Sequence, residues 1–320
     1  MKSHQRPLGE SSPDAGCIGG ALATVTVTYN PCLEELEDQL RALPASAIKV
    51  VVDNASRPQS LAGIESLIQR FANTKLIRND ANIGLGAAVN RGVQWVATLE
   101  RAPELVLLLD QDSKPTPGSI EALVRNLKRL DAAGHKVGCV GPLLLDPTTG
   151  LTHGFHQCSR WRWKRINPSI GSPRPIPCAS LNGSGTLVPV ELFQRLGGLA
   201  EELFIDHVDT EWSFRILANG YGLWGIPKAV FEHAMGQSSV RIWCFGWRVW
   251  PVRPPNRHYY LFRNAMVLMG RAYVPRVWKV WALAKMLLTA GVVSITGPSR
   301  GLQIKNMWQG VRNGLDRRGG

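Results

Sequence analysis

Two aspartates separated by one residue are the feature of the sequence whose spacing points most directly to chemistry. Asp110 and Asp112 follow the apolar run Leu105–Leu109, and residues i and i+2 of an extended chain point to the same side. Carboxylates placed in this way can bind one Mg²⁺ or Mn²⁺ ion, with phosphate oxygens of a ligand completing the coordination. Aspartates after a strand are also common in turns, so the prediction of a metal site depends on the neighbouring segments.

Two further segments carry groups that suit a nucleotide. Asp53 ends the run Ile48–Val52, a position where α/β nucleotide-binding domains often place an acid for a ribose or base edge; the alternative is a turn in which Asp53 bonds its own backbone. The loop Asn82–Gly86 leads into a helical segment, and glycines with a helix N-terminus favour a bound anion. No GxGxxG follows the first apolar run, which disfavours a nicotinamide enzyme.

The elements that must position these groups are four apolar runs separated by amphipathic segments near 32–43, 60–73 and 86–101. This alternation predicts an α/β fold with a mostly parallel sheet flanked by helices. In such sheets ligands bind beyond the carboxyl ends of the strands, so the polar residues that follow all four runs should converge on one site. The four runs are Ala21–Thr28, Ile48–Val52, Lys75–Arg78 and Leu105–Leu109.

Downstream patterns are weaker but continue the same fold. A helix over 209–219 should end at Gly220, a glycine suited to the position after a helix. The other expected elements are a helix over 117–133, a strand over 138–145, an irregular stretch over 151–182, a turn and strand over 182–189, a helix over 190–197, two short strands within 223–233, and helices near 256–270 and 275–293.

Charge divides the chain into two parts that need separate explanations. Residues 241–320 contain 14 basic residues and one acidic residue, Asp316, whereas the first 240 residues contain equal numbers of both, so the tail accounts for the whole net charge of +13. We therefore expect a flexible leader over 1–20, a folded domain over 21–240 and a basic helical extension over 241–320.

The extension is also rich in tryptophan, a combination typical of an anionic membrane surface; an ordinary basic helical unit is the alternative. Its longest charge-free apolar run, Met286–Ser299, is short of the roughly 20 residues that span a bilayer, so we expect a peripheral association. We find no nucleic-acid motif and expect no nucleic-acid partner. Scattered cysteines without zinc spacing fit reduced thiols in the cytoplasm. The six tryptophans are Trp243, Trp247, Trp250, Trp278, Trp281 and Trp308.

The order of the motifs resembles the family 2 glycosyltransferases of the GT-A fold over roughly residues 21–270. The matching segments are TYNP, VVDNAS, NxGxGxAxNxG, DQD, NGSG, FIDHVDTEW and HAMGQS. The segments FIDHVDTEWSFR and RNAMVL are similar to those of bacterial rhamnosyltransferases that act on cell-surface polysaccharide. The resemblance implies an inverting, metal-dependent transfer of a sugar, L-rhamnose from dTDP-rhamnose, to a lipid-linked or polysaccharide acceptor at the inner face of the cytoplasmic membrane.

The resemblance implies that residues 21–240 form the catalytic domain, with a nucleotide-sugar half to about 112 and an acceptor half from 113. It also implies roles for individual residues. Asp112 would ligate Mn²⁺ or Mg²⁺, Asp110 would lie by the ribose and the metal, and His233 would complete the metal site; an ordinary hydrogen-bonded histidine is the alternative. The nucleotide would be bound by Thr28, Tyr29, Asn30, Asp53, Asn82, Gly84 and Asp110.

On the acceptor side, Asp209 would be the catalytic base, with capping of its helix as the alternative reading. The glutamate that the family places before this aspartate is Val208 here. Ser184, Gly185, Glu211 and Trp212 would border the acceptor, although Glu211 can also be read as an exposed helix residue and Trp212 as a core residue.

Three other functions remain open. One is transfer from another donor such as UDP-galactofuranose or UDP-N-acetylhexosamine. A sugar nucleotidyltransferase is disfavoured because no LxGGxGxR loop follows the first strand. A non-catalytic nucleotide-sugar binding protein would not need a base. A processive synthase is disfavoured because the chain lacks QxxRW and, by the run-length criterion above, spanning helices.

Overall fold

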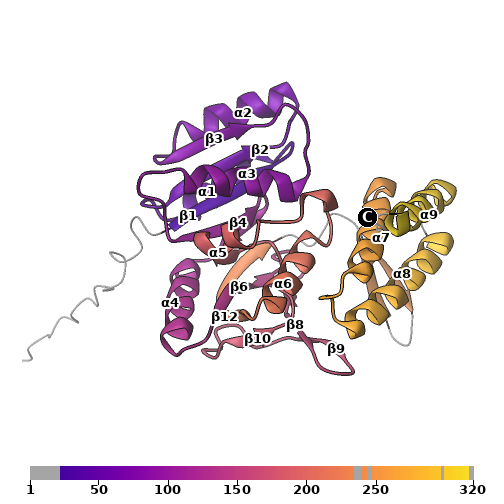
Figure 1. Cartoon of the computed structure of the whole chain (residues 1–320). Coiled ribbons are helices and arrows are strands. Elements are labelled where there is room, and N and C mark those ends of the chain that lie inside the picture. The colour runs from indigo at the N-terminus through magenta and orange to yellow at the C-terminus, as the bar shows by residue number, and fades with distance from the viewer. Residues whose placement is uncertain (1–21, 234–238, 244–246, 252, 297–298, 317–320) are drawn as a thin grey trace, which may run out of the picture.

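The computed structural model describes residues 22–233, 239–243, 247–251, 253–296 and 299–316, so the expected leader lies outside the described residues. The first half of the chain has the predicted alternation of strands and helices (Figure 1). Its elements are β1 (Leu22–Thr28), α1 (Leu33–Ala42), β2 (Ile48–Asp53), α2 (Pro58–Ile68), β3 (Thr74–Arg78), α3 (Leu85–Ala97) and β4 (Leu105–Asp110).

The second half departs from the expected pattern in two places. The stretch expected to be irregular contains short strands, and the two strands expected within 223–233 are one strand whose pairing with β6 shifts between Ile226 and Val230. The elements are β5 (Ser113–Pro115), α4 (Ser119–Ala132), β6 (Val137–Leu145), β7 (Thr152–His153), β8 (Phe155–Cys158), β9 (Trp163–Ile166), β10 (Ile176–Cys178), β11 (Thr186–Pro189), α5 (Val190–Arg195), η1 (Glu201–Leu203), α6 (Val208–Ala218) and β12 (Gly222–His233).

The main sheet has the order β10-β12-β6-β11-β4-β1-β2-β3, with β5 paired to β12 and β7 to β6. β1 pairs in parallel with both β2 and β4, so the chain winds outward in two directions from β1. The strand order reverses between β1 and β4, and such a switch point opens a crevice at the carboxyl ends of the strands. β1 ends at Thr28 and β4 at Asp110, so the crevice lies beside the loops that follow these two strands.

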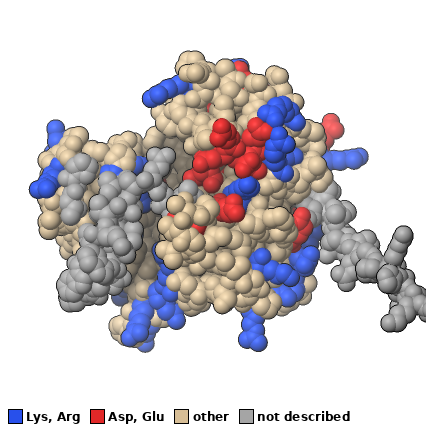
Figure 2. Space-filling model, turned by 180° about the vertical axis from the view of Figure 1, so that it is seen from behind, with Lys and Arg blue, Asp and Glu red and all other residues tan. Residues whose placement is uncertain are grey.

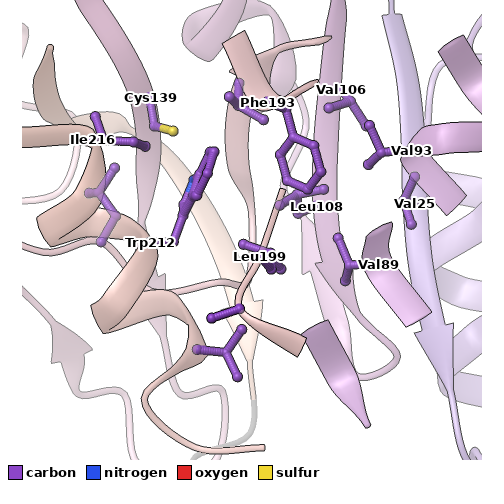
Figure 3. Packing of buried hydrophobic residues seen from close by; sticks show 14 of the residues in the cluster. Val25, Val89, Val93, Val106, Leu108, Cys139, Phe193, Leu199, Trp212 and Ile216 are labelled. Atoms are coloured by element: carbon purple, nitrogen blue, oxygen red, sulfur yellow. The ribbon is translucent and has the colours of Figure 1, made fainter. Parts of the chain in front are cut away.

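Helices cover both faces of the sheet and enclose two hydrophobic cores. One core joins β1 and β4 to α3, α5 and α6, and the other joins the opposite faces of the same strands to α1, α2 and α4. Figure 3 shows the first core, where the ring of Trp212 from α6 lies between Cys139 and Phe193. The centroids of the Phe193 and Trp212 rings are 5.1 Å apart. Burial on both faces explains the unbroken apolar runs of these strands.

The basic extension packs onto the catalytic domain through its helices. The side chain of Trp278 is 1% exposed and its ring meets the edge of Phe214 at 5.5 Å between centroids; Trp278 therefore belongs to the core and not to the interfacial tryptophans that we expected, whereas Trp308 is 68% exposed. The elements of the extension are β13 (Ser239–Trp243), β14 (Trp247–Pro251), α7 (Pro255–Gly270), α8 (Arg276–Thr296) and α9 (Arg300–Asp316), of which α9 was not predicted.

The length of α8 corrects one expectation. By length and composition, Arg276–Ile295 is apolar and long enough to cross a membrane, and a third of that window is buried inside the protein. Counting only charge-free residues stopped the predicted segment at Lys285, which lies in the middle of this helix. The expected lack of spanning helices therefore no longer separates the chain from processive synthases.

Candidate active site

The Asp110–Asp112 turn is held by a buried glutamine from α1. Gln39 is fully buried, and its amide nitrogen donates to the backbone oxygens of Asp110 and Ser113, each at 2.6 Å. Its amide oxygen accepts a hydrogen bond of 2.8 Å from the hydroxyl of Thr26 in β1. Because the amide groups of Gln39 bond to β1, β4 and β5, the turn that carries the two aspartates has a fixed position.

The two aspartates meet a histidine that comes from the other half of the sheet. β5 pairs with the end of β12, with His233 opposite Ser113, and the ligand atoms of Asp110, Asp112 and His233 all lie within 4.8 Å of one another. Nδ1 of His233 is 3.3 Å from a carboxylate oxygen of Asp112. Two carboxylates and one imidazole form a donor set that suits a divalent cation such as Mn²⁺.

The electrostatics of this cluster favour a positive partner. Burial raises the pKa of Asp110, and the charge of Asp112 acts in the same direction while that of His233 opposes it. Burial alone would lower the pKa of His233, but its hydrogen bond to Asp112 and the charges of both aspartates outweigh that effect, so the pKa is raised. A cation placed among these groups would relieve the repulsion between the two aspartates.

A cavity of about 810 Å³ opens beside the cluster. Eight of the residues predicted for the site line it, so the fold brings together groups that lie as much as 204 positions apart in the chain. They are Tyr29, Asn82, Gly84, Asp110, Asp112, Asp209, Trp212 and His233.

Asp209 lies in the first turn of α6, which begins at Val208 with His207 in the capping position. Asp209 is therefore not the N-cap that the alternative reading proposed. One of its carboxylate oxygens accepts the N–H of Thr210 at 2.7 Å. Burial raises its pKa to about 6; the hydrogen bond from Thr210 opposes this shift, and the charge of Asp110 adds to it. A carboxylate with a pKa near neutrality, facing a cavity, is suited to act as a base.

The segment before Asp209 has an unusual backbone. Phe204, Asp206 and His207 have φ values of 64°, 59° and 61°, which few residues other than glycine adopt. Gly84 packs directly on this segment: with its own φ of +87°, a Cβ there would lie 2.7 Å from Cα of Phe204. Strain of this kind persists only where surrounding groups hold it.

The groups that hold this segment come from α7. Asn264 is fully buried, and its amide nitrogen contacts the backbone oxygens of Leu203, Ile205 and Asp206 at 2.7–2.9 Å. Arg263 donates to the backbone oxygens of Glu202 and Leu203. These residues begin the RNAMVL segment, whose similarity to rhamnosyltransferases was noted above and whose structural role the sequence did not reveal.

Replacing Asn264 with alanine should therefore loosen the segment that precedes Asp209. Unpaired buried carbonyl groups should lower the free energy of unfolding by about 1–3 kcal/mol, and turnover should fall because the position of Asp209 is less defined. Thermal unfolding and donor turnover measure both effects. Asn306→Ala in α9, which removes a local bond to Leu302, is the matched control; equal effects of both variants would contradict the assigned role.

Several predicted site residues lie away from the cavity. Asp53 is 1% exposed, accepting hydrogen bonds from the hydroxyl of Thr28 at 3.2 Å and from the backbone N–H of Ser56 at 3.0 Å. Asn30 bonds the same loop through Ser56 and Arg57. Thr28, Asn30 and Asp53 thus join the loops after β1 and β2, as in the turn reading of Asp53, and do not line the cavity.

Asn54 occupies the place expected for Asp53. It lines the cavity, and its amide oxygen accepts the backbone N–H of Ile83 at 3.0 Å while its nitrogen donates to Asn82 at 2.9 Å. The sequence contained the signal for it, since Asn54 is the next residue of the same strand end.

Three of the four predicted acceptor residues, Ser184, Gly185 and Glu211, do not line the cavity. Ser184 is fully buried and contacts Ser113, and Gly185 has a φ of +81° with Pro142 and Phe231 packed against it. Both residues shape the sheet behind the cavity, while the preceding Asn182 and Gly183 line it.

Glu211 is part of an ion-pair network instead of the cavity wall. Its side chain is fully buried, with carboxylate oxygens 2.8 Å from Arg215 and 2.7 Å from Arg271. The hydroxyl of Tyr273 donates a third bond of 2.5 Å. Arg271 and Tyr273 follow α7, so this network joins α6 to the extension, a long-range contact that local sequence could not reveal.

A further group at the cavity was missed in the sequence. Asp206 accepts hydrogen bonds from Arg257 at 2.9 Å and from Arg253 at 3.2 Å, and all three residues line the cavity. The extension thereby contributes two cations to a site that was expected to end near residue 240.

Comparison with known proteins shows the family to which this chain belongs. The sequence profile of Glycosyl transferase family 2 matches residues 25–197, and the chain belongs to that family. The resemblance predicted from the motifs is thereby confirmed.

Among its relatives, the dTDP-rhamnosyl transferase RfbF of Shigella flexneri is 31% identical over 279 residues, covering 85% of this chain and 88% of that protein. An N-acetylglucosaminyl-diphospho-decaprenol L-rhamnosyltransferase of Mycobacterium tuberculosis is 28% identical over 249 residues, covering 69% of this chain and 78% of the other. The mannosyltransferase PcManGT of Pyrobaculum calidifontis, solved with GDP-Man and Mn²⁺, superposes with a TM-score of 0.55 at 17% identity, covering 98% and 92% of the two chains. This likeness confirms the predicted GT-A fold.

Proposed function

We propose that this protein transfers L-rhamnose, with inversion, from dTDP-L-rhamnose to a lipid-linked or polysaccharide acceptor in the synthesis of a cell-surface glycan. The observation that carries the proposal is that Asp209 and the cluster of Asp110, Asp112 and His233 line one cavity of about 810 Å³. The choice of sugar is supported by the names of the two relatives, which are both rhamnosyltransferases.

The chemistry follows from the positions of these groups. Asp209 takes the proton of the acceptor hydroxyl, and the hydroxyl oxygen forms a bond to the anomeric carbon of the donor sugar. The bond from that carbon to the diphosphate breaks on the opposite face, and its electron pair leaves with the nucleoside diphosphate. A raised pKa lets Asp209 exchange this proton near neutral pH.

Asp110, Asp112 and His233 would hold Mn²⁺ or Mg²⁺, and their mixed oxygen and nitrogen donors favour Mn²⁺. Such an ion supplies Lewis-acid stabilisation of the charge that develops on the leaving diphosphate. Tyr29, Asn54, Asn82 and Gly84 line the part of the cavity next to the ends of β1 and β2, where we place the nucleoside. We place the enzyme at the cytoplasmic face of the membrane, where a lipid-linked acceptor is available.

Donor turnover tests this proposal. With Mn²⁺ and a diphosphate-lipid-linked N-acetylglucosamine acceptor, we expect the kcat/KM for dTDP-L-rhamnose to exceed that for UDP-galactofuranose or a UDP-N-acetylhexosamine by at least about 100-fold. The product glycoside should have the anomeric configuration opposite to that of the donor, which NMR can establish.

Other outcomes would identify the other functions. Faster transfer from a UDP-sugar would replace the donor assignment but keep the class of reaction. Release of pyrophosphate from a nucleoside triphosphate and a sugar phosphate would indicate a nucleotidyltransferase. Donor binding without transfer or hydrolysis would indicate a binding protein.

A further inference from the structure

A group of basic side chains lies beside the active-site cavity and has no role in the chemistry described above. Two of its members face one another across the β8–β9 hairpin, where His156 is the cross-strand partner of Arg165. A third, Lys285, projects from α8 over the ring of Trp281, with its ammonium nitrogen 4.8 Å from the ring centroid. We call Arg165, Lys285, His153 and His156 the hairpin cation cluster.

Stacked rings fix the hairpin against α8. The His156 and Trp163 rings are stacked with centroids 5.2 Å apart, and the Trp163 and Trp281 rings are 6.1 Å apart. Trp281 and Lys285 are four residues apart in α8 and so share one face of the helix. The cations of the cluster are therefore carried by a packed framework and not by free loops.

The two charged members of this cluster, Arg165 and Lys285, form no ion pair with a described residue. In the described part of the chain, neither Arg165 nor Lys285 forms an ion pair or a side-chain hydrogen bond, whereas Arg215, Arg257 and Arg271 all pair with carboxylates. Both side chains are exposed, so an anion can reach these two unpaired charges from the solvent.

The effect of these charges on one another's pKa values indicates that the side chains lie close together. Desolvation by the surrounding protein, followed by the charges of Arg253 and Arg165, lowers the pKa of Lys285 to about 8. Burial and then the charges of Arg165 and Lys285 lower the pKa of His156 to about 4. Lys285 and Arg165 therefore remain charged at pH 7, while His156 is neutral.

The position of the cluster relates it to the acceptor. His153 lines the same cavity as Asp209, and Lys285 lies near enough to Asp206 and His207 for their charges to interact. The cluster therefore adjoins the wall of the cavity that leads to the candidate base.

Beyond the cluster, α8 presents an apolar face. Leu288, three residues from Lys285 and therefore its neighbour on the helix surface, is 40% exposed, and the apolar surface continues through Val280 and Leu287, which are 70% and 68% exposed. The tail surface visible in Figure 2 carries Lys and Arg but no Asp or Glu. From the cavity outward, the molecule thus offers a base, then cations, then an apolar surface without negative charge.

We propose that Arg165 and Lys285 bind the phosphate groups of a diphosphate-linked lipid acceptor, whose hydrocarbon chain lies along the exposed face of α8. The inference rests on the proposed function, because it names the part of the acceptor that this site recognises. The order of base, cations and apolar face matches the order of hydroxyl, diphosphate and lipid in such an acceptor.

Direct binding tests the proposal without depending on the donor. Farnesyl diphosphate, with farnesol as the uncharged comparison, is titrated calorimetrically into the full chain. We expect tighter binding of the diphosphate, and Arg165→Gln and Lys285→Gln should each weaken it by about tenfold, the scale of a charge-assisted hydrogen bond. Lys164→Gln, an exposed lysine on the opposite face of β9, should leave binding unchanged. Equal binding of farnesyl diphosphate and farnesol, or equal effects of all three variants, would overturn the proposal.

Kinetics then separate the acceptor from membrane phospholipid. With a short-chain diphosphate-linked sugar in solution, both Gln variants should raise the acceptor KM about tenfold, while the KM for the donor and for an alkyl glycoside of the same sugar should not change. Variants that lose only binding to anionic vesicles and keep the acceptor KM would assign the cations to lipid headgroups and overturn the proposal. An inactive wild-type protein that still binds farnesyl diphosphate through these residues would contradict the proposed function alone.

Discussion

Replacement of Asp209 with asparagine is expected to lower the rate of sugar transfer by about 10²–10⁴-fold, the usual contribution of a general base. The amide has nearly the same shape and can still accept the N–H of Thr210, so the structure of the cavity should persist. The Kd for the donor nucleotide should therefore remain close to that of the wild type. Single-turnover transfer and nucleotide titration measure the two quantities separately.

The pH dependence of the wild-type enzyme provides a second test of the role of Asp209. Burial raises the pKa of Asp209 to about 6, and only the ionised form can accept a proton. The rate of transfer should consequently rise as the pH increases through about 6 and level off above it. The asparagine variant should lack this rise.

Ionisation of Asp209 should raise the rate of transfer but lower the stability of the fold. An aspartate in an unfolded chain has a pKa of about 3.9, so the folded protein binds this proton more tightly. The carboxyl group then stabilises the fold at low pH relative to its ionised form, and that stability is lost as the pH rises through the folded pKa. At pH 7 Asp209→Asn should unfold at an equal or higher temperature than the wild type.

Glu211→Gln is the matched control, two residues further along α6. Because Glu211 is buried between Arg215 and Arg271, its neutralisation should destabilise the protein without the pH signature of a base. Wild-type rates in Asp209→Asn, or an identical loss in both variants, would contradict the assignment of Asp209.

The second large effect is expected at the carboxylate cluster. Asp112→Ala should lower transfer by at least about 10²-fold at limiting Mn²⁺, because the remaining groups no longer hold the charge that stabilises the leaving diphosphate. Excess Mn²⁺ should restore part of the rate, since Asp110 and His233 still lie together. Steady-state rates over a range of Mn²⁺ concentrations measure this shift.

The wild type treated with a chelator should lose the same activity and regain it with Mn²⁺. Asp131→Ala, which removes an exposed carboxylate at the end of α4, should behave as the wild type in both experiments. Transfer that is indifferent to chelation and to Asp112 would exclude a metal-dependent mechanism.

The parts of this molecule that could be predicted are those set by local pattern. The strand β4 could be predicted from an unbroken apolar run because both of its faces are buried. Asp110 and Asp112 could be placed at the edge of the sheet because the carboxyl ends of parallel strands lie at one edge. Asp209 and His233 were reached through their place in a series of motifs, and the fold brings both to the cavity.

The parts that could not be predicted depend on distant contacts. Nothing near Glu211 indicates that Arg271 will bury it, and nothing near Trp278 indicates that Phe214 will cover it. Asn54 lines the cavity and the predicted Asp53 does not, because Asp53 is bonded to Thr28 and Ser56 in the neighbouring loops. In each case the side chain has the expected chemistry, but a remote segment decides which surface it meets.

The hydrogen bonds from Asn264 to the backbone oxygens before α6 have a consequence for how the enzyme can be regulated. A chain cut after residue 240 would retain Asp209, the carboxylate pair and His233. It would lose Asn264 and with it the hydrogen bonds that hold the segment before α6. Because Asn264 lies on the same helical unit as the exposed face of α8, any force that a bilayer exerted on this unit would reach the segment before Asp209, the proposed base. Turnover should therefore respond to the lipid surface itself, in the manner of interfacial activation.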